Sequence, residues 1–146
     1  TKTVLDDNPA LDVRHWKGES PVRIVIDREL KIPKNLKTYD QSVKTIFMNE
    51  RETFVNGNIV FEKIDFSKPI AFQICELLFT HKIQSVIIEG GATTLQTFID
   101  ENLWDEARVF KSEANFNEGV KAPKLDSIHN KEENIKGDIL KTYRND

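Results

Sequence analysis

The chain has 146 residues, of which 38% are hydrophobic and 31% are charged, and its formal net charge is −3 at pH 7. This length and composition are typical of one globular domain, and the acidic balance argues against a basic surface for nucleic acid or anionic membranes. No apolar run approaches the roughly 20 residues of a membrane-spanning helix, so no membrane span is predicted either.

The first half of the chain predicts three short strands joined by polar connections. β-Branched and aromatic residues dominate three runs that are expected to be strands: residues 22–27, 43–49 and 59–65. The cluster Asp6-Asp7-Asn8-Pro9 predicts a turn near the N-terminus, and residues 28–42 have no regular period. Asn56-Gly57 is a pair typical of tight turns, and it precedes the third strand.

The second half predicts two helices that alternate with strands. Residues 67–82 carry apolar side chains at helical spacing, with Ser67 as the expected N-cap and Pro69 in the first turn. The nearly continuous apolar run IQSVIIEG, residues 83–90, predicts a strand buried on both faces. A helix is expected at residues 91–103 and a strand at residues 104–112. A polar loop is expected at residues 114–125, and an antiparallel edge strand at residues 135–145. This order predicts one α/β domain over residues 1–146 with a mixed sheet.

The cysteine and histidine residues give no sign of a disulfide or a metal centre. Cys75 is the single cysteine, which is typical of a cytoplasmic protein, and its apolar neighbours predict a buried thiol. His15, His81 and His129 lack metal-ligand spacing, so no metal ligand is predicted. The charged run at residues 130–138 is expected to form a solvated loop.

The stretch Glu89-Gly90-Gly91-Ala92-Thr93-Thr94 lies where the predicted buried strand ends and a helix begins. Ligands of open α/β sheets bind beyond the carboxyl ends of the strands, and glycine lets a ligand approach the backbone. The N–H groups at the helix start and the threonine hydroxyls therefore favour a phosphate or pyrophosphate site. A plain strand-to-helix turn explains the same spacing equally well. Glu89 favours a functional site, because its carboxylate would accept hydrogen bonds from sugar hydroxyls.

Several motifs occur in an order that resembles a known family. The segment TVLDDNPALDVR, residues 3–14, resembles the motif T-V-L-x-D-D-P-x-L-T-x-R in the reductase domain of bifunctional riboflavin-biosynthesis deaminase–reductases. PVRIVIDRELKIP resembles the strand and turn that follow that motif, and IIEGGATTLQTFIDENLWDEARVF is similar to the family's V-E-G-G-x-x-L-x-x-F segment. KAPKL is similar to a late A-P loop, so the resemblance covers most of the chain.

The resemblance implies a dihydrofolate-reductase-like, three-layer α/β fold with a mixed, mainly parallel sheet. It implies one reaction, in which NADPH reduces the ribosyl side chain of 5-amino-6-(5-phosphoribosylamino)uracil to a ribityl chain. Hydride reaches C1′ of the opened sugar while the protein binds and orients the reactants, so no catalytic side chain is assigned. The implied partners are this pyrimidine ribose-phosphate and a second copy of the chain in a homodimer.

The family's substrate positions fall on three residues of this chain. Leu11, Arg14 and Glu89 match them by their place in the motifs. The guanidinium of Arg14 suits a sugar phosphate, because its planar fork can bind phosphate through two nitrogens.

The family's cofactor positions fall on two further parts of the chain. Thr3 and Asp7 match cofactor contacts in the first motif, and Arg28 follows the strand where the family places another contact. We expect Arg28 to reach the 2′-phosphate of the cofactor. The other implied cofactor residues form the loop and helix start: Gly91, Ala92, Thr93, Thr94, Leu95, Gln96 and Thr97.

The chain departs from the family pattern in two ways. Asn8 replaces the second aspartate of the first motif, and Asp12 replaces a common threonine. The family domain also begins with a strand and a helix upstream of this motif, and this strand and helix are not present here. The H-x-E and P-C-x-x-C ligands of the zinc deaminase domain are not present either. We therefore expect the C-terminal part of a longer protein, with a deaminase domain fused on its N-terminal side.

Other functions remain open on the sequence. The chain could be a non-catalytic nucleotide-phosphate-binding or dimerising module of the same fold, or a dihydrofolate-reductase-like reductase with another substrate. Asp7, Arg14 and Glu89 together favour the reductase of riboflavin biosynthesis, because a phosphate site alone would need none of them.

Overall fold

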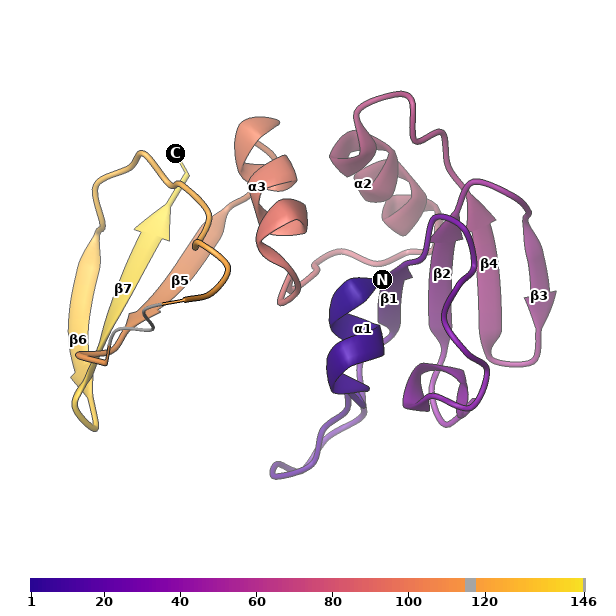
Figure 1. Ribbon diagram of the computed structural model, residues 1–146, viewed down its shortest axis with the longest axis horizontal. Helices are drawn as coiled ribbons and strands as arrows, with labels where there is room; N and C mark the ends of the chain where they lie inside the picture. The colour runs from indigo at the N-terminus through magenta and orange to yellow at the C-terminus, as the bar shows by residue number, and fades with distance from the viewer. Residues whose placement is uncertain (115–117, 146) are drawn as a thin grey trace. The chain divides into compact units, whose positions relative to one another are not determined.

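The computed structural model describes residues 1–114 and 118–145 (Figure 1). Contacts divide the chain into an N-terminal unit, Thr1–Leu77, and a C-terminal unit, Leu78–Asp146. The N-terminal unit contains α1 (Lys2–Asp7), β1 (Arg23–Ile26), the 3₁₀ helix η1 (Lys37–Tyr39), β2 (Thr45–Asn49), β3 (Phe54–Asn56) and β4 (Ile59–Lys63). Helix α2 (Ile70–Thr80) spans the boundary, and the C-terminal unit continues with α3 (Ala92–Asp100), β5 (Glu106–Lys111), β6 (Lys131–Ile135) and β7 (Asp138–Arg144). Within the described ranges, no helix is long and apolar enough to cross a membrane.

The N-terminal unit is built on a four-stranded sheet in the order β1-β2-β4-β3. Strands β1, β2 and β4 are parallel, and β3 runs antiparallel to β4, so the sheet is mixed and mostly parallel as predicted. The three strands predicted from β-branched runs are confirmed. Strand β3 was not predicted, because Asn56 both ends this strand and opens the expected turn. Gly57 in that turn has a φ of 59°, a conformation that suits glycine.

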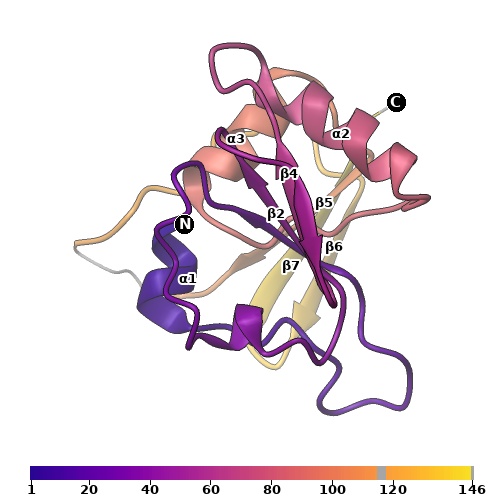
Figure 2. The same cartoon turned by 90° about the vertical axis from the view of Figure 1, so that its right-hand side faces the viewer.

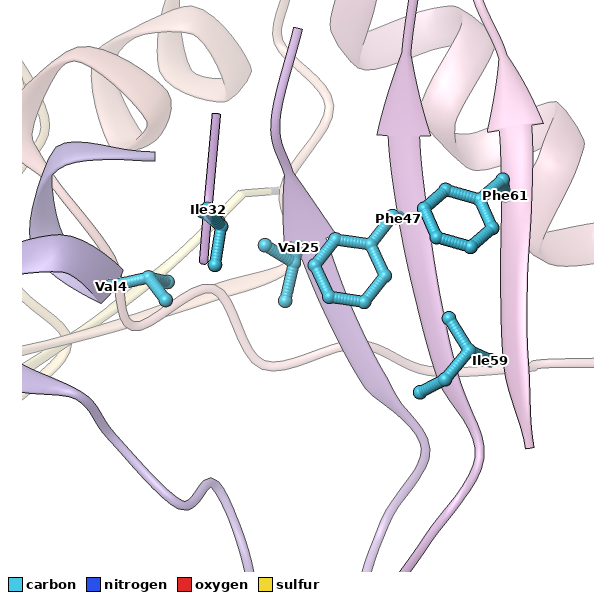
Figure 3. Close-up of a cluster of buried hydrophobic side chains, with 6 residues drawn as sticks. All are labelled: Val4, Val25, Ile32, Phe47, Ile59 and Phe61. Atoms are coloured by element: carbon cyan, nitrogen blue, oxygen red, sulfur yellow. The ribbon is translucent and has the colours of Figure 1, made fainter. Parts of the chain in front are cut away.

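The core of the N-terminal unit lies on one face of this sheet (Figure 3). Val25, Phe47 and Phe61 stand side by side on three neighbouring strands, because their positions are in register. The ring of Phe47 is fully buried and stacks on Phe61 and on Tyr39, with centroids 5.4 and 4.3 Å apart. Burial raises the pKa of Tyr39 to about 12. Val4 belongs to the same cluster, and it seats α1 on the sheet.

The opposite face of the sheet carries a second set of buried side chains. Ile46 and Met48 on β2 are fully buried, and Figure 2 shows α1 and α2 on opposite sides of this sheet. Helix α2 has buried side chains at Ala71, Ile74 and Leu78, at the helical spacing that the sequence predicts. The predicted cap is wrong, because the helix begins at Ile70 and the Ser67 hydroxyl donates to Asp65 Oδ1 at 2.6 Å instead. Cys75 is half-buried.

Helix α1 replaces the irregular turn expected at the N-terminus. Residues 2–7 are helical because Val4 finds a place in the core, a contact that local propensity does not reveal. Asn8 ends the helix in the left-handed conformation, with φ 42° and ψ 55°, which asparagine tolerates better than most residues. Its side-chain Oδ1 accepts a 2.9 Å hydrogen bond from the N–H of Lys37. Asn8, which departs from the family motif, therefore has a structural role.

A buried arginine connects β1 to the segment after η1. Arg23 is 2% exposed, and its Nη1 donates to Asp40 Oδ1 at 2.7 Å and to the carbonyl of Lys37 at 3.0 Å. Its Nη2 donates to Ser42 Oγ at 3.1 Å. The hydrogen bond from Arg23 lowers the pKa of Asp40 to about 2.

Asp40→Asn is expected to lower the free energy of unfolding by about 1 kcal/mol at pH 7, because Arg23 loses a charged acceptor that is itself partly screened by solvent. The folded-state pKa of Asp40 is depressed, so its contribution is present above the ordinary value of 3.8 and is lost as the pH falls towards 2. Urea unfolding of the wild type and of Asp40→Asn should show that the difference between their free energies of unfolding becomes smaller from pH 7 to pH 3. Asp126→Asn, at an exposed carboxylate, is the control. A difference that grows on acidification would contradict this assignment.

The C-terminal unit contains a three-stranded antiparallel sheet in the order β5-β7-β6. Strand β5 confirms the prediction at residues 104–112. Strand β7 is antiparallel as predicted, but it is the central strand and not an edge. The loop predicted at residues 130–138 is wrong, since β6 occupies most of it. Glu132 faces Lys141 across the ladder, and their side chains approach to 3.2 Å, so charged residues form this strand through cross-strand pairing.

The segment at residues 83–90 is not the buried strand that its apolar run predicts. No strand of the described chain pairs with it, and the side chains of Val86 and Ile87 are 41% and 85% exposed. The N–H of Ile83 bonds to the carbonyl of Leu78 at the end of α2. An apolar run becomes a strand only when a neighbouring strand completes its hydrogen bonds, and that neighbour is missing among residues 1–114 and 118–145.

Candidate functional site

The start of α3 has an open and unusual backbone. Gly91 is the N-cap, with φ 61° and ψ 129°, a conformation that L side chains rarely adopt. Helix α3 has no side-chain cap, so the first N–H groups of the helix are not used by a capping residue. A Cβ added at Gly90 would meet no atom within 4 Å. This backbone therefore leaves room for a ligand next to hydrogen-bond donors.

A cavity of 370 Å³ lies beside this helix start. It is lined by residues of α3 and by a loop that precedes β6: Ala92, Thr93, Gln96, Thr97, Asp100, Lys121, Ala122 and Pro123. Four of these belong to the predicted cofactor segment. The hydroxyl of Thr97 donates to the carbonyl of Thr93 at 2.9 Å, so its proton is already used within the helix. Glu89, which precedes this segment, is exposed.

The predicted site residues of the N-terminal unit lie on α1 and on the segment that follows it. Thr3 and Asp7 are exposed and one helical turn apart, so they share a face of α1. Leu11 has a φ of 50°, which is uncommon for a residue with a side chain of this size. Arg14 is 65% exposed, and its Nε lies 3.2 Å from Asp12 Oδ1. Asp12, the second departure from the family motif, thus contacts the arginine predicted to bind substrate.

Arg28 is exposed and already has an acidic partner. Its Nε donates to Glu50 Oε2 at 2.6 Å, and this hydrogen bond raises the pKa of Arg28 above its ordinary value. Its guanidinium carbon also lies 5.3 Å from the centroid of the Phe66 ring. A cofactor phosphate at Arg28 would therefore share the guanidinium with Glu50.

The structure brings some of the predicted residues together within each unit, but among the residues that it describes it shows no contact that joins Leu11, Arg14 and Arg28 to one another. Thr3 and Asp7 share a face of α1, and Ala92, Thr93, Gln96 and Thr97 line one cavity, whereas Gly91, Thr94 and Leu95 do not line it. Sequence reasoning missed Lys121 and Asp100, although the KAPKL segment that contains Lys121 was one of the motifs. In the part of the chain that the structure describes, no group of three or more His, Cys, Asp or Glu residues could hold a metal ion.

Comparisons with known proteins bear on this site. The family model described as the RibD C-terminal domain matches residues 1–112. The riboflavin biosynthesis protein RibD of Aquifex aeolicus is 30% identical over 139 residues, which cover 92% of this chain and 39% of that protein. A 2,5-diamino-6-ribosylamino-4(3H)-pyrimidinone 5′-phosphate reductase of the same organism is 30% identical over 124 residues, which cover 74% of this chain and 52% of that protein.

A solved structure extends the similarity to the fold. The diaminohydroxyphosphoribosylaminopyrimidine deaminase/5-amino-6-(5-phosphoribosylamino)uracil reductase of Thermotoga maritima matches with a TM-score of 0.85 and 25% identity, over 100% of this chain and 44% of that one. The chain spans about half or less of the length of these relatives. Its mixed, mostly parallel sheet is that of the dihydrofolate-reductase-like α/β fold. The family match over residues 1–112, together with these relatives, places the chain in the RibD C-terminal domain family.

Proposed function

We propose that residues 1–146 form the reductase domain of an enzyme of riboflavin biosynthesis. The domain uses NADPH to reduce the ribosyl side chain of 5-amino-6-(5-phosphoribosylamino)uracil to the ribityl chain. Family membership supports the reductase role, since the relatives include proteins named as reductases. The observation that carries the proposal for this chain is the cavity beside α3, because four residues of the predicted cofactor segment line it.

The residues around the cavity fit a nicotinamide dinucleotide. Its phosphates need N–H donors, which the uncapped start of α3 offers, and a cation, which Lys121 offers. They also need close access to the backbone, which Gly90 allows. When bound, the cofactor supplies the hydride. The side chains of Thr3 and Asp7 are proposed to hold its polar groups, and Arg28 to contact the 2′-phosphate.

The substrate is proposed to contact Leu11, Arg14 and Glu89. Leu11 holds a left-handed backbone conformation in the segment between α1 and β1, and its place in the motif is what supports this role. The exposed guanidinium of Arg14 contacts Asp12 through Nε, which leaves its two terminal nitrogens to bind the sugar phosphate. The carboxylate of Glu89 accepts hydrogen bonds from sugar hydroxyls and so orients C1′ for hydride transfer.

The reductase proposal is tested by binding and turnover with matched ligands. NADPH and NADH fluorescence titrations measure cofactor binding, and oxidation of NADPH is then followed with each of the two pyrimidine phosphates for which the relatives are named. Turnover of the uracil compound supports the proposal. Turnover of the diaminopyrimidinone alone would keep the reductase role but replace the proposed substrate with that compound. Binding of NADPH without turnover of either compound would favour a non-catalytic module. If neither dinucleotide binds, the reductase proposal fails.

Arg14→Ala is expected to raise the KM for the pyrimidine substrate about tenfold or more, because a charge-assisted contact with phosphate is lost. The KM for NADPH should stay within about twofold, since a phosphate contact on the substrate adds nothing to cofactor binding. Steady-state kinetics with each ligand varied in turn provide the measurement. Arg108→Ala is the matched control, because Arg108 is 69% exposed and also contacts a carboxylate two residues earlier. Equal losses for both ligands would refute the role of Arg14.

We further propose a cytoplasmic homodimer whose subunits each carry a deaminase domain on the N-terminal side. The length of the RibD relative supports the additional domain, because this chain covers 39% of that protein. The name of the Thermotoga protein includes both a deaminase and a reductase activity.

A further inference from the structure

The side-chain amide of Gln96 joins α3 to the loop at residues 121–124. The N–H of Lys124 donates to Gln96 Oε1 at 2.7 Å, and Gln96 Nε2 donates back to the carbonyl of Lys124 at 3.3 Å. The second hydrogen of Nε2 is given to Asp100 Oδ1 at 2.7 Å. Because both N–H groups of this amide are used within the protein, the amide has no donor left for a ligand.

The loop held by Gln96 supplies one wall of the cavity. Lys121, Ala122 and Pro123 line the space opposite α3, so the position of this wall depends on the contact between Gln96 and Lys124. Lys121 is exposed, and it has no ion-pair partner among the residues that the structure describes. Its ammonium group is therefore available to an anion in the cavity.

Asp100 also lines the cavity, and its charge would repel an anion there. The hydrogen bond from Gln96 Nε2 to Asp100 Oδ1 opposes this repulsion, because it places a donor against the carboxylate. Gln96 thus acts on both charged residues of the cavity, holding the loop that carries Lys121 and donating to Asp100.

We propose that Lys121 binds a phosphate group of the dinucleotide and that Gln96 is the positioning residue that holds Lys121 in place. This inference rests on the proposed function, and it changes the expected role of Gln96 from a direct contact to an indirect one. A lysine ammonium binds phosphate as a compact point charge on a flexible stem, and the position of its backbone sets which part of the cavity that stem can reach. The phosphate is either the pyrophosphate, which NADPH and NADH share, or the 2′-phosphate, which NADPH alone carries.

Fluorescence titrations of the full chain with NADPH and NADH test both parts of the proposal. Lys121→Ala is expected to weaken NADPH binding about tenfold, the loss typical of a charge-assisted contact. Gln96→Ala should weaken it several-fold in the wild-type background and much less in the Lys121→Ala background, because Gln96 acts through Lys121. An equal loss of NADH affinity identifies the pyrophosphate, and a loss confined to NADPH identifies the 2′-phosphate; both support the proposal.

Gln73 provides a matched control in the other unit. Its amide makes the same two-way contact, accepting from the N–H of Asp65 at 2.9 Å and donating to the carbonyls of Asp65 and Pro69 at 2.9 and 3.0 Å. Gln73→Ala should lower Tm as Gln96→Ala does, but it should leave NADPH affinity unchanged.

Three results would overturn the inference while the reductase proposal stands. The first is that Lys121→Ala binds NADPH as well as the wild type does, and the second is that the losses of NADPH affinity in the double variant simply add. The third is that Gln73→Ala weakens NADPH binding as much as Gln96→Ala does. If the wild-type chain binds neither dinucleotide, both proposals fail together.

Discussion

Gly90→Ala is expected to weaken NADPH binding about 10- to 100-fold, or roughly 1.4–2.8 kcal/mol, while the free energy of unfolding changes little. The reason is that a Cβ at Gly90 meets no protein atom within 4 Å, so only a ligand that approaches the backbone would collide with it. Titration with NADPH and urea unfolding of the same preparation separate these two effects.

The neighbouring glycine provides the contrasting variant. Gly91 has a φ of 61°, so Gly91→Ala should destabilise the start of α3 by about 1–2 kcal/mol whether or not a ligand is bound. Full NADPH affinity in Gly90→Ala would show that no ligand group lies against this backbone. The cavity would then have to bind the cofactor through side chains alone.

Phe47→Ala is expected to lower the free energy of unfolding by about 3–5 kcal/mol, a large share of the 5–15 kcal/mol typical of a folded domain. Phe47 is fully buried and stacks on two other rings, so its removal leaves a cavity that these rings cannot fill without moving. Thermal and urea unfolding measure the loss. Phe79→Ala is the control, because the Phe79 side chain is 83% exposed and its truncation should cost less than about 0.5 kcal/mol.

The same substitution should also affect cofactor binding. Val4 packs in the cluster that contains Phe47, and it seats the helix that presents Thr3 and Asp7. A loosened core therefore leaves these two side chains without a fixed position. A Phe47→Ala protein that remains as stable as wild type would show that the aromatic stack contributes little to this unit.

Patterns that repeat over a few residues were sufficient to predict much of the fold. The parallel strands β1, β2 and β4 and helix α2 were found because runs of β-branched and aromatic residues and helical spacing are local properties of the sequence. Helix α1 was missed because tertiary contacts at Val4, at Thr1 and at Asn8 hold it, and a local pattern does not show these contacts. Strand β6 was missed because its charges suggest a loop, whereas its pairing with β7 makes it a strand.

The sequence identified part of the lining of the candidate cavity, and the roles of the site residues stay predictions. Residues 91–97 follow one another, so a motif identifies them together, and four of them line the cavity. The contact between Gln96 and Lys124 joins residues 28 positions apart, and no local pattern reveals such a pair. Lys121 was overlooked for the same reason, because only the folded loop brings it to α3.

The apolar run at residues 86–88, in which Val86 and Ile87 are exposed and Ile88 is half-buried, affects how the protein behaves in concentrated solution. Val86, Ile87 and Ile88 are β-branched, contain no charge and form no strand with the rest of the described chain. Short runs of this kind are templates for pairing between molecules, and they promote aggregation when they are accessible. The charged side chains of Lys82 and Glu89 flank the run and oppose such pairing. The exposed side chains of Val86 and Ile87 therefore favour self-association of the isolated chain as its concentration rises.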